Sequence, residues 1–307
     1  MHRRDFLKTS FVGAVAGLSA GGIKAMAADA PPAPAKPAVL KLCSQEGKIP
    51  GKSLKEKAET ILKFGGCGLE FGGMSAERAK QIKQDLAGTG VGVAALCWGR
   101  FSLMDSDAEK RKKAVEDLKK ALEVAAEAGS TGVIVVPNPQ MPFEDGLKIL
   151  ADVLPAVGEH GVKVGNRVLL EPLCGGEAKF MNRLEQAVAI IKAAGGGPGL
   201  GLMGDFYHMC KEEKDDEQAF VTADGYCHHV HLASRVRWLP GQDKLREPDK
   251  PERSFVAGFK GLKRIGYQDY CSLECNTSGD KQHPSDPMVE IPKSFAFLKQ
   301  QWAEAVI

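Results

Sequence analysis

Four residues able to bind a metal ion occur at matching places along the second half of the chain. Each one ends, or nearly ends, a short apolar segment flanked by amphipathic sequence. Carboxylate and imidazole groups together suit divalent ions such as Mn²⁺ or Mg²⁺. The four residues are Glu171, Asp205, His231 and Glu274.

Each of these residues also has a simpler interpretation. A glutamate before a proline, such as Glu171, is usually a cap or loop residue, and an aspartate followed three residues later by histidine, as in Asp205 and His208, is usually a helix start. Solvated acids, however, would not recur at equivalent ends of four consecutive segments. We therefore favour one shared metal site over four unrelated polar residues.

The elements that must position these residues alternate regularly. Short apolar runs typical of buried parallel strands are followed by longer segments with apolar residues three and four positions apart. The predicted strands are residues 39–43, 67–71, 92–98, 132–137, 167–172, 200–205, 227–232 and 270–275. The predicted helices are residues 54–64, 76–87, 107–128, 144–159, 179–194, 211–222, 252–265 and 288–303.

Eight strand–helix units in about 265 residues predict an α/β fold of the (β/α)₈ TIM-barrel class. The alternative is an open doubly wound sheet, but no GxGxxG turn follows the first predicted strand. In a barrel the carboxyl ends of all strands meet at one mouth, so the four residues should converge. Trp98 closes the third predicted strand, where it would form either an apolar wall for a sugar ring or ordinary core.

Longer motifs around these residues resemble a known family. The chain reads Glu-Pro-Leu from Glu171, Asp-Phe-Tyr-His-Met from Asp205, and His-Val-His from His229, followed by an arginine and a Pro-Gly pair. Over about residues 40–302 the chain is similar to the xylose-isomerase-like sugar isomerases and epimerases, which include ketose 3-epimerases and hydroxypyruvate isomerase.

The resemblance implies a role for each motif residue. One divalent ion, with Mn²⁺ favoured and Mg²⁺, Co²⁺ or Zn²⁺ as alternatives, would be held by Glu171, Asp205, His231 and Glu274. A small sugar substrate would contact Glu177, His208 and Arg237. For Arg237 the alternative is a surface cation paired with Asp243 or Glu247.

The chemistry expected of such a site is proton transfer next to a carbonyl group. A metal chelated by the substrate carbonyl and the adjacent hydroxyl stabilises the enediolate formed when the intervening carbon loses its proton. Glu171 and Glu274 are the expected catalytic pair, one removing a proton from one face and the other returning one to the opposite face. We therefore expect a metal-dependent sugar isomerase or epimerase. The alternative is an inosose-dehydratase-like lyase or hydratase that acts on 3-keto-sugars or 3-keto-glycosides through the same site.

Two other functional classes fit less well. A metal-dependent DNA-repair barrel would need more histidine ligands and a basic surface, and a non-catalytic sugar-binding barrel would not need all four ligands. Cys174-Gly175-Gly176 and Ala233-Ser234 depart from the family's usual segments beside the substrate. The identity of the substrate therefore stays open.

The first thirty residues form a separate segment. Arg3-Arg4 precedes Phe-Leu-Lys and an apolar, glycine-rich run to Met26, which predicts a cleavable twin-arginine signal over residues 1–30. A proline-rich linker, 31–38, and a catalytic barrel, 39–307, would follow. The protein would then engage the Tat translocon and be periplasmic or secreted, without a stable membrane anchor. A buried or membrane-anchoring N-terminal helix is the alternative.

Charge and cysteine content restrict the partners. Cleavage after Ala27 would change the formal charge from +2 to about −1, so the mature body has no electrostatic footprint for nucleic acid. The eight cysteines include no CxxC pair and mostly fall within apolar runs, so we predict free thiols. A homo-oligomer is left open.

Overall fold

The computed structural model describes residues 36–99, 101–137 and 139–307. The predicted signal segment, 1–30, and the first part of the predicted linker, 31–35, lie outside the described residues. Among the described helices, none is long and apolar enough to cross a membrane.

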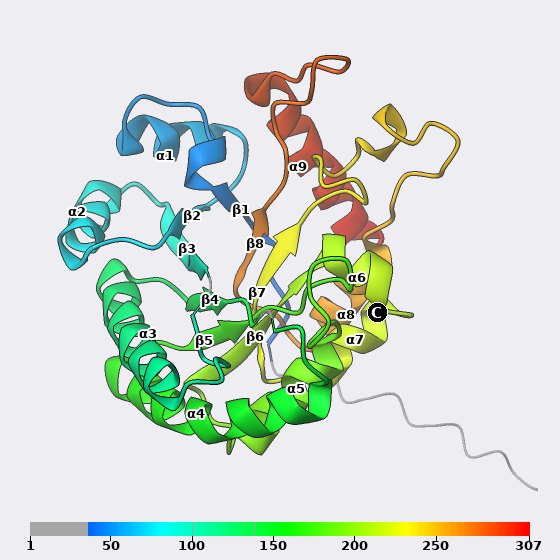
Figure 1. Ribbon diagram of the computed structural model, residues 1–307. Coiled ribbons are helices and arrows are strands. Elements are labelled where there is room, and N and C mark those ends of the chain that lie inside the picture. The colour runs from blue at the N-terminus through cyan, green and yellow to red at the C-terminus, as the bar shows by residue number, and fades with distance from the viewer. Residues whose placement is uncertain (1–35, 100, 138) are drawn as a thin grey trace, which may run out of the picture. The chain divides into compact units, whose positions relative to one another are not determined.

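Eight parallel strands form a closed barrel in which each strand pairs with its neighbours in sequence (Figure 1). The barrel closes where β1 pairs with β8, with Cys43 opposite Ser272. The strands are β1 Lys41–Gln45, β2 Gly68–Gly72, β3 Gly92–Gly99, β4 Val133–Val135, β5 Val168–Leu170, β6 Leu200–Asp205, β7 Cys227–Leu232 and β8 Tyr270–Leu273. The predicted TIM barrel is confirmed.

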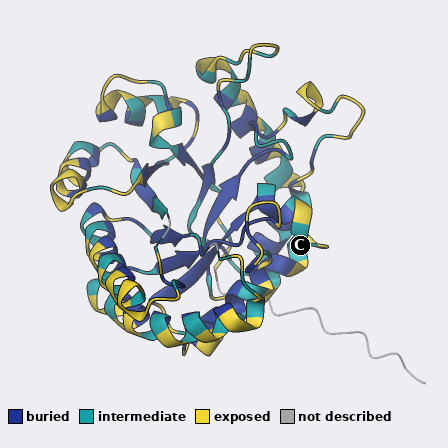
Figure 2. Ribbon diagram, viewed as in Figure 1, coloured by how far each residue is buried: buried dark blue, intermediate teal, exposed yellow. Residues whose placement is uncertain are grey.

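Helices surround the barrel and turn their exposed faces outward (Figure 2). They are α1 Leu54–Lys63, α2 Ala76–Leu86, α3 Ala108–Ala128, α4 Phe143–Val164, α5 Leu184–Ala193, α6 Phe206–Glu212, α7 Asp216–Thr222, α8 Val256–Arg264 and α9 Pro287–Glu304. Two 3-10 turns, η1 Glu46–Lys48 and η2 Asp243–Leu245, lie in the loops after β1 and β7.

The helix predicted over 144–159 continues to Val164, and three other predicted helix boundaries were wrong for local reasons. The helix predicted over 211–222 is two helices, because Glu213 is extended and Asp215 caps a new start at α7. The helix predicted from residue 179 begins at Leu184, since the Asn182 side chain instead donates to the carbonyls of Leu173 and Ala178. The helix predicted from residue 252 begins at Val256, because the preceding segment places a buried arginine against α6 and α7.

Side-chain caps fix the first turns of several helices. Ser53, Ser75 and Asp107 each accept a hydrogen bond from a backbone N–H in the helix that follows. Such caps satisfy donors that have no partner inside the helix. The helix starts, and hence the loops at the barrel mouth, are therefore set locally.

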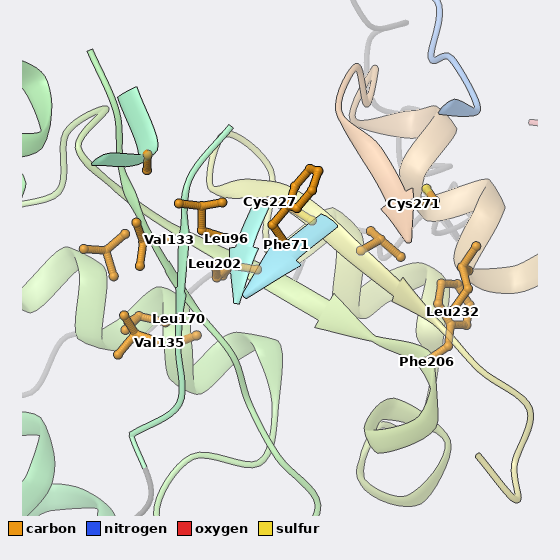
Figure 3. Packing of buried hydrophobic residues seen from close by; sticks show 14 of the residues in the cluster. Phe71, Leu96, Val133, Val135, Leu170, Leu202, Phe206, Cys227, Leu232 and Cys271 are labelled. Carbon is orange, nitrogen blue, oxygen red and sulfur yellow. The ribbon is translucent and has the colours of Figure 1, made fainter. Parts of the chain in front are cut away.

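The core has two parts, one outside and one inside the barrel. Outward strand residues pack against the helices and include Phe71, Leu96, Val133, Leu170 and Leu202 (Figure 3). A small inner cluster consists of Ala95, Ile134, Leu169 and Met203, with Cys97 packed against it. All eight cysteines lie in the described residues and none forms a disulfide. The inner cluster fills the barrel and forms the floor beneath the mouth.

A close backbone approach at Gly199, directly before β6, gives the first prediction. A Cβ atom at this position would lie 2.0 Å from the backbone oxygen of Gly158 in α4. Gly199→Ala should therefore lower the free energy of unfolding by about 1–3 kcal/mol. Gly47, which has open space around its Cα and no positive φ, is the control, and Gly47→Ala should change stability by less than about 0.5 kcal/mol. Equal urea midpoints for the two variants would contradict the packing.

Candidate metal and active site

The four residues predicted as metal ligands meet at the carboxyl-terminal mouth of the barrel. One ligand atom from each of Glu171, Asp205, His231 and Glu274 lies within 4.8 Å of the others. Glu171, Asp205 and His231 are buried, and Glu274 is partly exposed. The cluster is therefore open to solvent on the Glu274 side.

Strand alternation explains why these side chains point inward. Asp205 lies two residues after Met203, and Glu171 two residues after Leu169, so both continue the rows of the inner cluster. The backbone N–H of Glu171 donates to the Val135 carbonyl at 3.1 Å, which extends the β4–β5 pairing by one residue. The apolar floor and the polar site are thus consecutive layers of the same barrel interior.

A register shift between β6 and β7 brings aspartate and histidine side by side. Leu202 pairs with Cys227 but Met203 pairs with His229, so β7 contains one extra residue there. Beyond this bulge Asp205 is the direct partner of His231. Bulges commonly re-aim side chains next to active sites, and here the bulge turns His229 and His231 into the barrel.

Asp205 divides its two carboxylate oxygens between the fold and the site. Oδ1 accepts a hydrogen bond from the backbone N–H of Tyr207 at 2.8 Å and caps α6. Oδ2 lies 3.1 Å from Arg237 Nη1 and 3.5 Å from His208 Nε2. The cap therefore fixes the rotamer that aims Oδ2 at the cluster.

The imidazole of His231 meets the requirements of a metal ligand. Its Nε2 is 2.8 Å from Glu70 Oε2, which orients the ring. Its Nδ1 is buried and has no hydrogen-bond partner among the described residues. That atom faces Glu274 Oε2 at 3.2 Å and Glu171 Oε1 at 3.6 Å. An unpartnered buried nitrogen that faces carboxylates, with its other nitrogen held by a carboxylate, fits a bound divalent ion.

The electrostatics of the cluster favour the binding of a cation. Burial raises the pKa of Glu171 to about 7, although His231 acts to lower it. Burial lowers the pKa of His231, but Glu70 and Glu274 outweigh it and hold that pKa well above its ordinary value. A cation bound at Nδ1 would take the place of the proton and offset the crowded carboxylates.

Glu70 is a residue of the site that sequence reasoning missed. Its Oε2 atom lies 2.8 Å from Nε2 of both His229 and His231, and its Oε1 accepts from Gln45 Nε2 at 3.2 Å. Burial raises the pKa of Glu70, but the two histidines hold it below its ordinary value. The available signal was a lone acid inside the apolar β2 sequence Gly-Leu-Glu-Phe-Gly.

Arg237 lies inside the site and not on the outer surface. Its guanidinium pairs with Asp205 and Glu274, and its carbon lies 4.5 Å from the ring centre of Tyr207. The surface pairing considered as an alternative belongs to Arg235, whose Nη1 lies 3.3 Å from Glu247.

The backbone of Arg237 is in the left-handed region, with φ of 60°. Ser234 holds this turn, because its backbone N–H donates to the Trp238 carbonyl at 2.8 Å and its Oγ accepts from the Trp238 N–H at 3.1 Å. The Arg237 carbonyl in turn accepts from Asn276 N–H at 2.8 Å. Strain of this kind is tolerated where the surroundings over-determine it. The Ala233-Ser234 departure from the family pattern thus builds the turn that presents Arg237.

His208 and Glu177 lie on the β5–β6 side of the mouth. The backbone N–H of Cys174 donates to His208 Nδ1 at 3.1 Å, which leaves Nε2 to carry a proton toward the site. Glu177 is exposed and lies next to Cys174 Sγ, outside the four-residue cluster. The Cys174-Gly175-Gly176 loop is therefore part of the site wall.

Trp98 does not face the cluster of four candidate ligands. Trp98 lies at a register shift between Cys97 and Gly99, packs against the outer core and Gly73, and lines a separate cavity of about 650 Å³ with Phe101 and one face of α3. Of the two sequence interpretations, outer packing is the one that the structure favours.

Glu70 gives the second prediction. Glu70→Gln removes the charge that orients His231, so Mn²⁺ affinity should fall about 10- to 100-fold while the four ligands remain. Calorimetric titration of the metal-free protein measures this. Exposed Glu77 on α2 supplies the matched control, Glu77→Gln. Unchanged Mn²⁺ affinity in Glu70→Gln would show that Glu70 does not support the ligand.

Comparison with known proteins identifies the family of the chain. The model of the family described as xylose isomerase-like TIM barrel matches residues 61–301. The 3-dehydro-D-guloside 4-epimerase of Escherichia coli (strain K12) is 26% identical over 274 residues, which cover 85% of this chain and 99% of that protein. The ketose 3-epimerase of Arthrobacter globiformis is 30% identical over 162 residues, covering 51% of this chain and 53% of that protein.

Solved structures show the same fold. The apo structure of a 3-keto-D-glucoside 4-epimerase from E. coli superposes with a TM-score of 0.72 at 25% identity, covering 85% of this chain and 100% of that one. An L-ribulose 3-epimerase superposes with a TM-score of 0.73 at 21% identity, covering 87% and 96%. The chain belongs to the xylose isomerase-like TIM barrel family, whose relatives matched here are sugar epimerases.

Proposed function

We propose that this protein is a divalent-metal-dependent sugar epimerase that inverts a carbon next to a carbonyl group. The observation that carries the proposal is the convergence of three carboxylates and the oriented imidazole of His231, whose Nδ1 atom makes no hydrogen bond within the described residues and faces Glu274 and Glu171. Membership of a family with sugar epimerase relatives supports the same reaction class.

The proposed metal ligands are Glu171, Asp205, His231 and Glu274. A divalent ion held there would polarise the substrate carbonyl and offset the negative charge that develops on its oxygen. Mn²⁺ is our first choice because the donor set combines hard carboxylate oxygens with one imidazole nitrogen.

Glu171 and Glu274 are the proposed proton-transfer residues. They come from β5 and β8, on either side of His231, whose Nδ1 atom they both face. One carboxylate removes the proton from one face of the substrate carbon, and the other returns a proton to the opposite face. The roles exchange when the reaction runs in reverse.

His208 and Arg237 are the proposed donors to substrate oxygens. Both lie against Asp205 Oδ2, at 3.5 Å and 3.1 Å, so their N–H groups border the cluster. Fixed donors at this position would hold the carbonyl and its neighbouring hydroxyl in the orientation that exposes the reacting carbon. Glu177, exposed at the rim, would contact a more distant hydroxyl.

A 3-keto-glycoside is the substrate class we favour, with free ketoses second. The E. coli relative that spans 99% of its own length in the match is named for a 3-dehydro-glycoside, whereas the ketose 3-epimerase matches over 53% of its length. The twin-arginine motif in the sequence supports export as a further part of the proposal. Outside the cytoplasm, unphosphorylated sugars and glycosides are the available substrates.

The third prediction tests the reaction. Proton NMR in D₂O, with Mn²⁺-loaded protein and 3-keto-glycosides or ketoses, should show deuterium entering at a carbon beside the carbonyl, together with an epimer. Glu274→Gln should lower the rate by about 10²–10⁴, the usual contribution of a positioned acid–base group. Exposed Glu144 provides the control Glu144→Gln, which should keep full activity. A product that has lost a substituent would overturn epimerisation in favour of elimination, and no exchange with any substrate would contradict both.

The fourth prediction concerns metal removal. Mn²⁺ at 100 times its Kd should stabilise the folded protein by about 2.7 kcal/mol, and a chelator should reverse the gain. At the same Mn²⁺ concentration Asp205→Asn should give a clearly smaller stabilisation, because it weakens a ligand while leaving an oxygen to cap α6. Thermal unfolding with and without Mn²⁺ measures the difference. A melting temperature that does not respond to Mn²⁺ would contradict the proposed metal site.

A further inference from the structure

A pocket lies beside the cluster of four candidate metal ligands. A cavity of about 470 Å³ lies at the ends of β1, β7 and β8, with Glu274 and Arg237 in its wall. Its other walls include Gln45, Lys48, Trp238 and Asn276. Because Glu274 belongs to both, this open pocket adjoins the proposed reacting centre.

The shared wall is rigidly held. Gln45 Nε2 lies 3.2 Å from Glu274 Oε1 and 3.2 Å from Glu70 Oε1, so one amide ties the cavity to the buried support of the site. On the other side, Asn276 uses both ends of its side chain within its own loop, bonding to Gly279 and Ser278. The Asn276 amide and Gln45 Nε2 are therefore engaged within the protein, and the amide oxygen of Gln45, an acceptor, does not attract an anion.

Among the charged side chains of this wall, Lys48 is the one without a paired group in the part of the chain that the structure describes. Arg237 and Glu274 are paired with each other, and the nearby Glu46 is paired with Lys57 at 2.5 Å. No ion pair or side-chain hydrogen bond of Lys48 occurs within residues 36–99, 101–137 and 139–307. Its half-buried position in η1 is fixed by buried Ile49, whose N–H donates to the Glu46 carbonyl.

We propose that this cavity binds the part of the substrate beyond the reacting carbons, and that Lys48 pairs there with an anionic substituent of the sugar or of its aglycone. Lys48 adds one unpaired positive charge next to the Arg237–Glu274 ion pair, whose charges offset each other. This charge favours an anionic group of the ligand over a neutral one. Buried Trp238 supplies an apolar wall for the carbon skeleton between them. The inference rests on the proposed function, because it assigns a substrate class to that same site.

Binding to the Mn²⁺-loaded protein tests the inference without relying on turnover. Calorimetry would compare methyl 3-keto-β-D-glucoside with three charged analogues: its C6 carboxylate, its C6 phosphate, and the glycoside with a 4-carboxyphenyl aglycone. At least one charged analogue should bind about tenfold more tightly than the neutral glycoside. The analogue that gains most identifies the anion as carboxylate or phosphate and places it on the ring or on the aglycone.

Three variants separate a specific contact from a general charge effect. Lys48→Ala should remove the tenfold preference and leave binding of the neutral glycoside unchanged, whereas Lys48→Arg should retain the preference. Exposed Lys52, four residues along the same loop and outside the cavity lining, supplies the control Lys52→Ala, which should have no effect. Equal binding of all four ligands by the wild type, or equal weakening of all by Lys48→Ala, would overturn the subsite.

The two proposals fail in different ways. Deuterium exchange without any preference for the charged analogues would remove the subsite and leave the epimerase proposal standing. A Lys48-dependent preference for a charged analogue, without deuterium exchange on any ligand, would leave the subsite standing and remove the epimerase proposal.

Discussion

The Glu70 carboxylate, buried at the centre of the barrel, binds the rings of His229 and His231 through one oxygen. Removing such a charge from water costs several kcal/mol unless partners compensate. Here the partners are the two imidazoles and Gln45, so strands β1, β2 and β7 must hold their side chains at fixed positions. The orientation of His231, and with it the direction of its free Nδ1 atom, follows from this arrangement. The rest of the site is built around that direction.

Much of the architecture could be predicted from the sequence because the periodic features are local. Continuous apolar runs, helical spacing and caps such as Asp107 specify strand and helix order without long-range information. The four candidate ligands could be named for the same reason, since each one ends a predicted strand of the second half. Their closeness in space then follows from barrel closure.

What the sequence did not reveal depends on contacts between distant segments. Glu70 stands 159 residues from His229, and no local pattern marks it as the partner of that ring. The turn that gives Arg237 its positive φ is closed locally by Ser234, but the N–H that holds the Arg237 carbonyl comes from Asn276, which only tertiary packing brings there. Likewise Trp98 was ambiguous until strand pairing decided which face of β3 it occupies.

The two carboxylate oxygens of Asp205 have different roles. Oδ1 caps α6, and Oδ2 belongs to the four-residue cluster. A change that moved this ligand to another position would therefore also alter the start of α6 and displace His208, which lies in the first turn of that helix. We therefore expect the β6–α6 junction to tolerate little sequence change. In the loops after β1 and β7, the side chains of Lys48 and Trp238 do not combine two such roles. We therefore expect new substrate specificities to arise in these loops first, around an unchanged chemical centre.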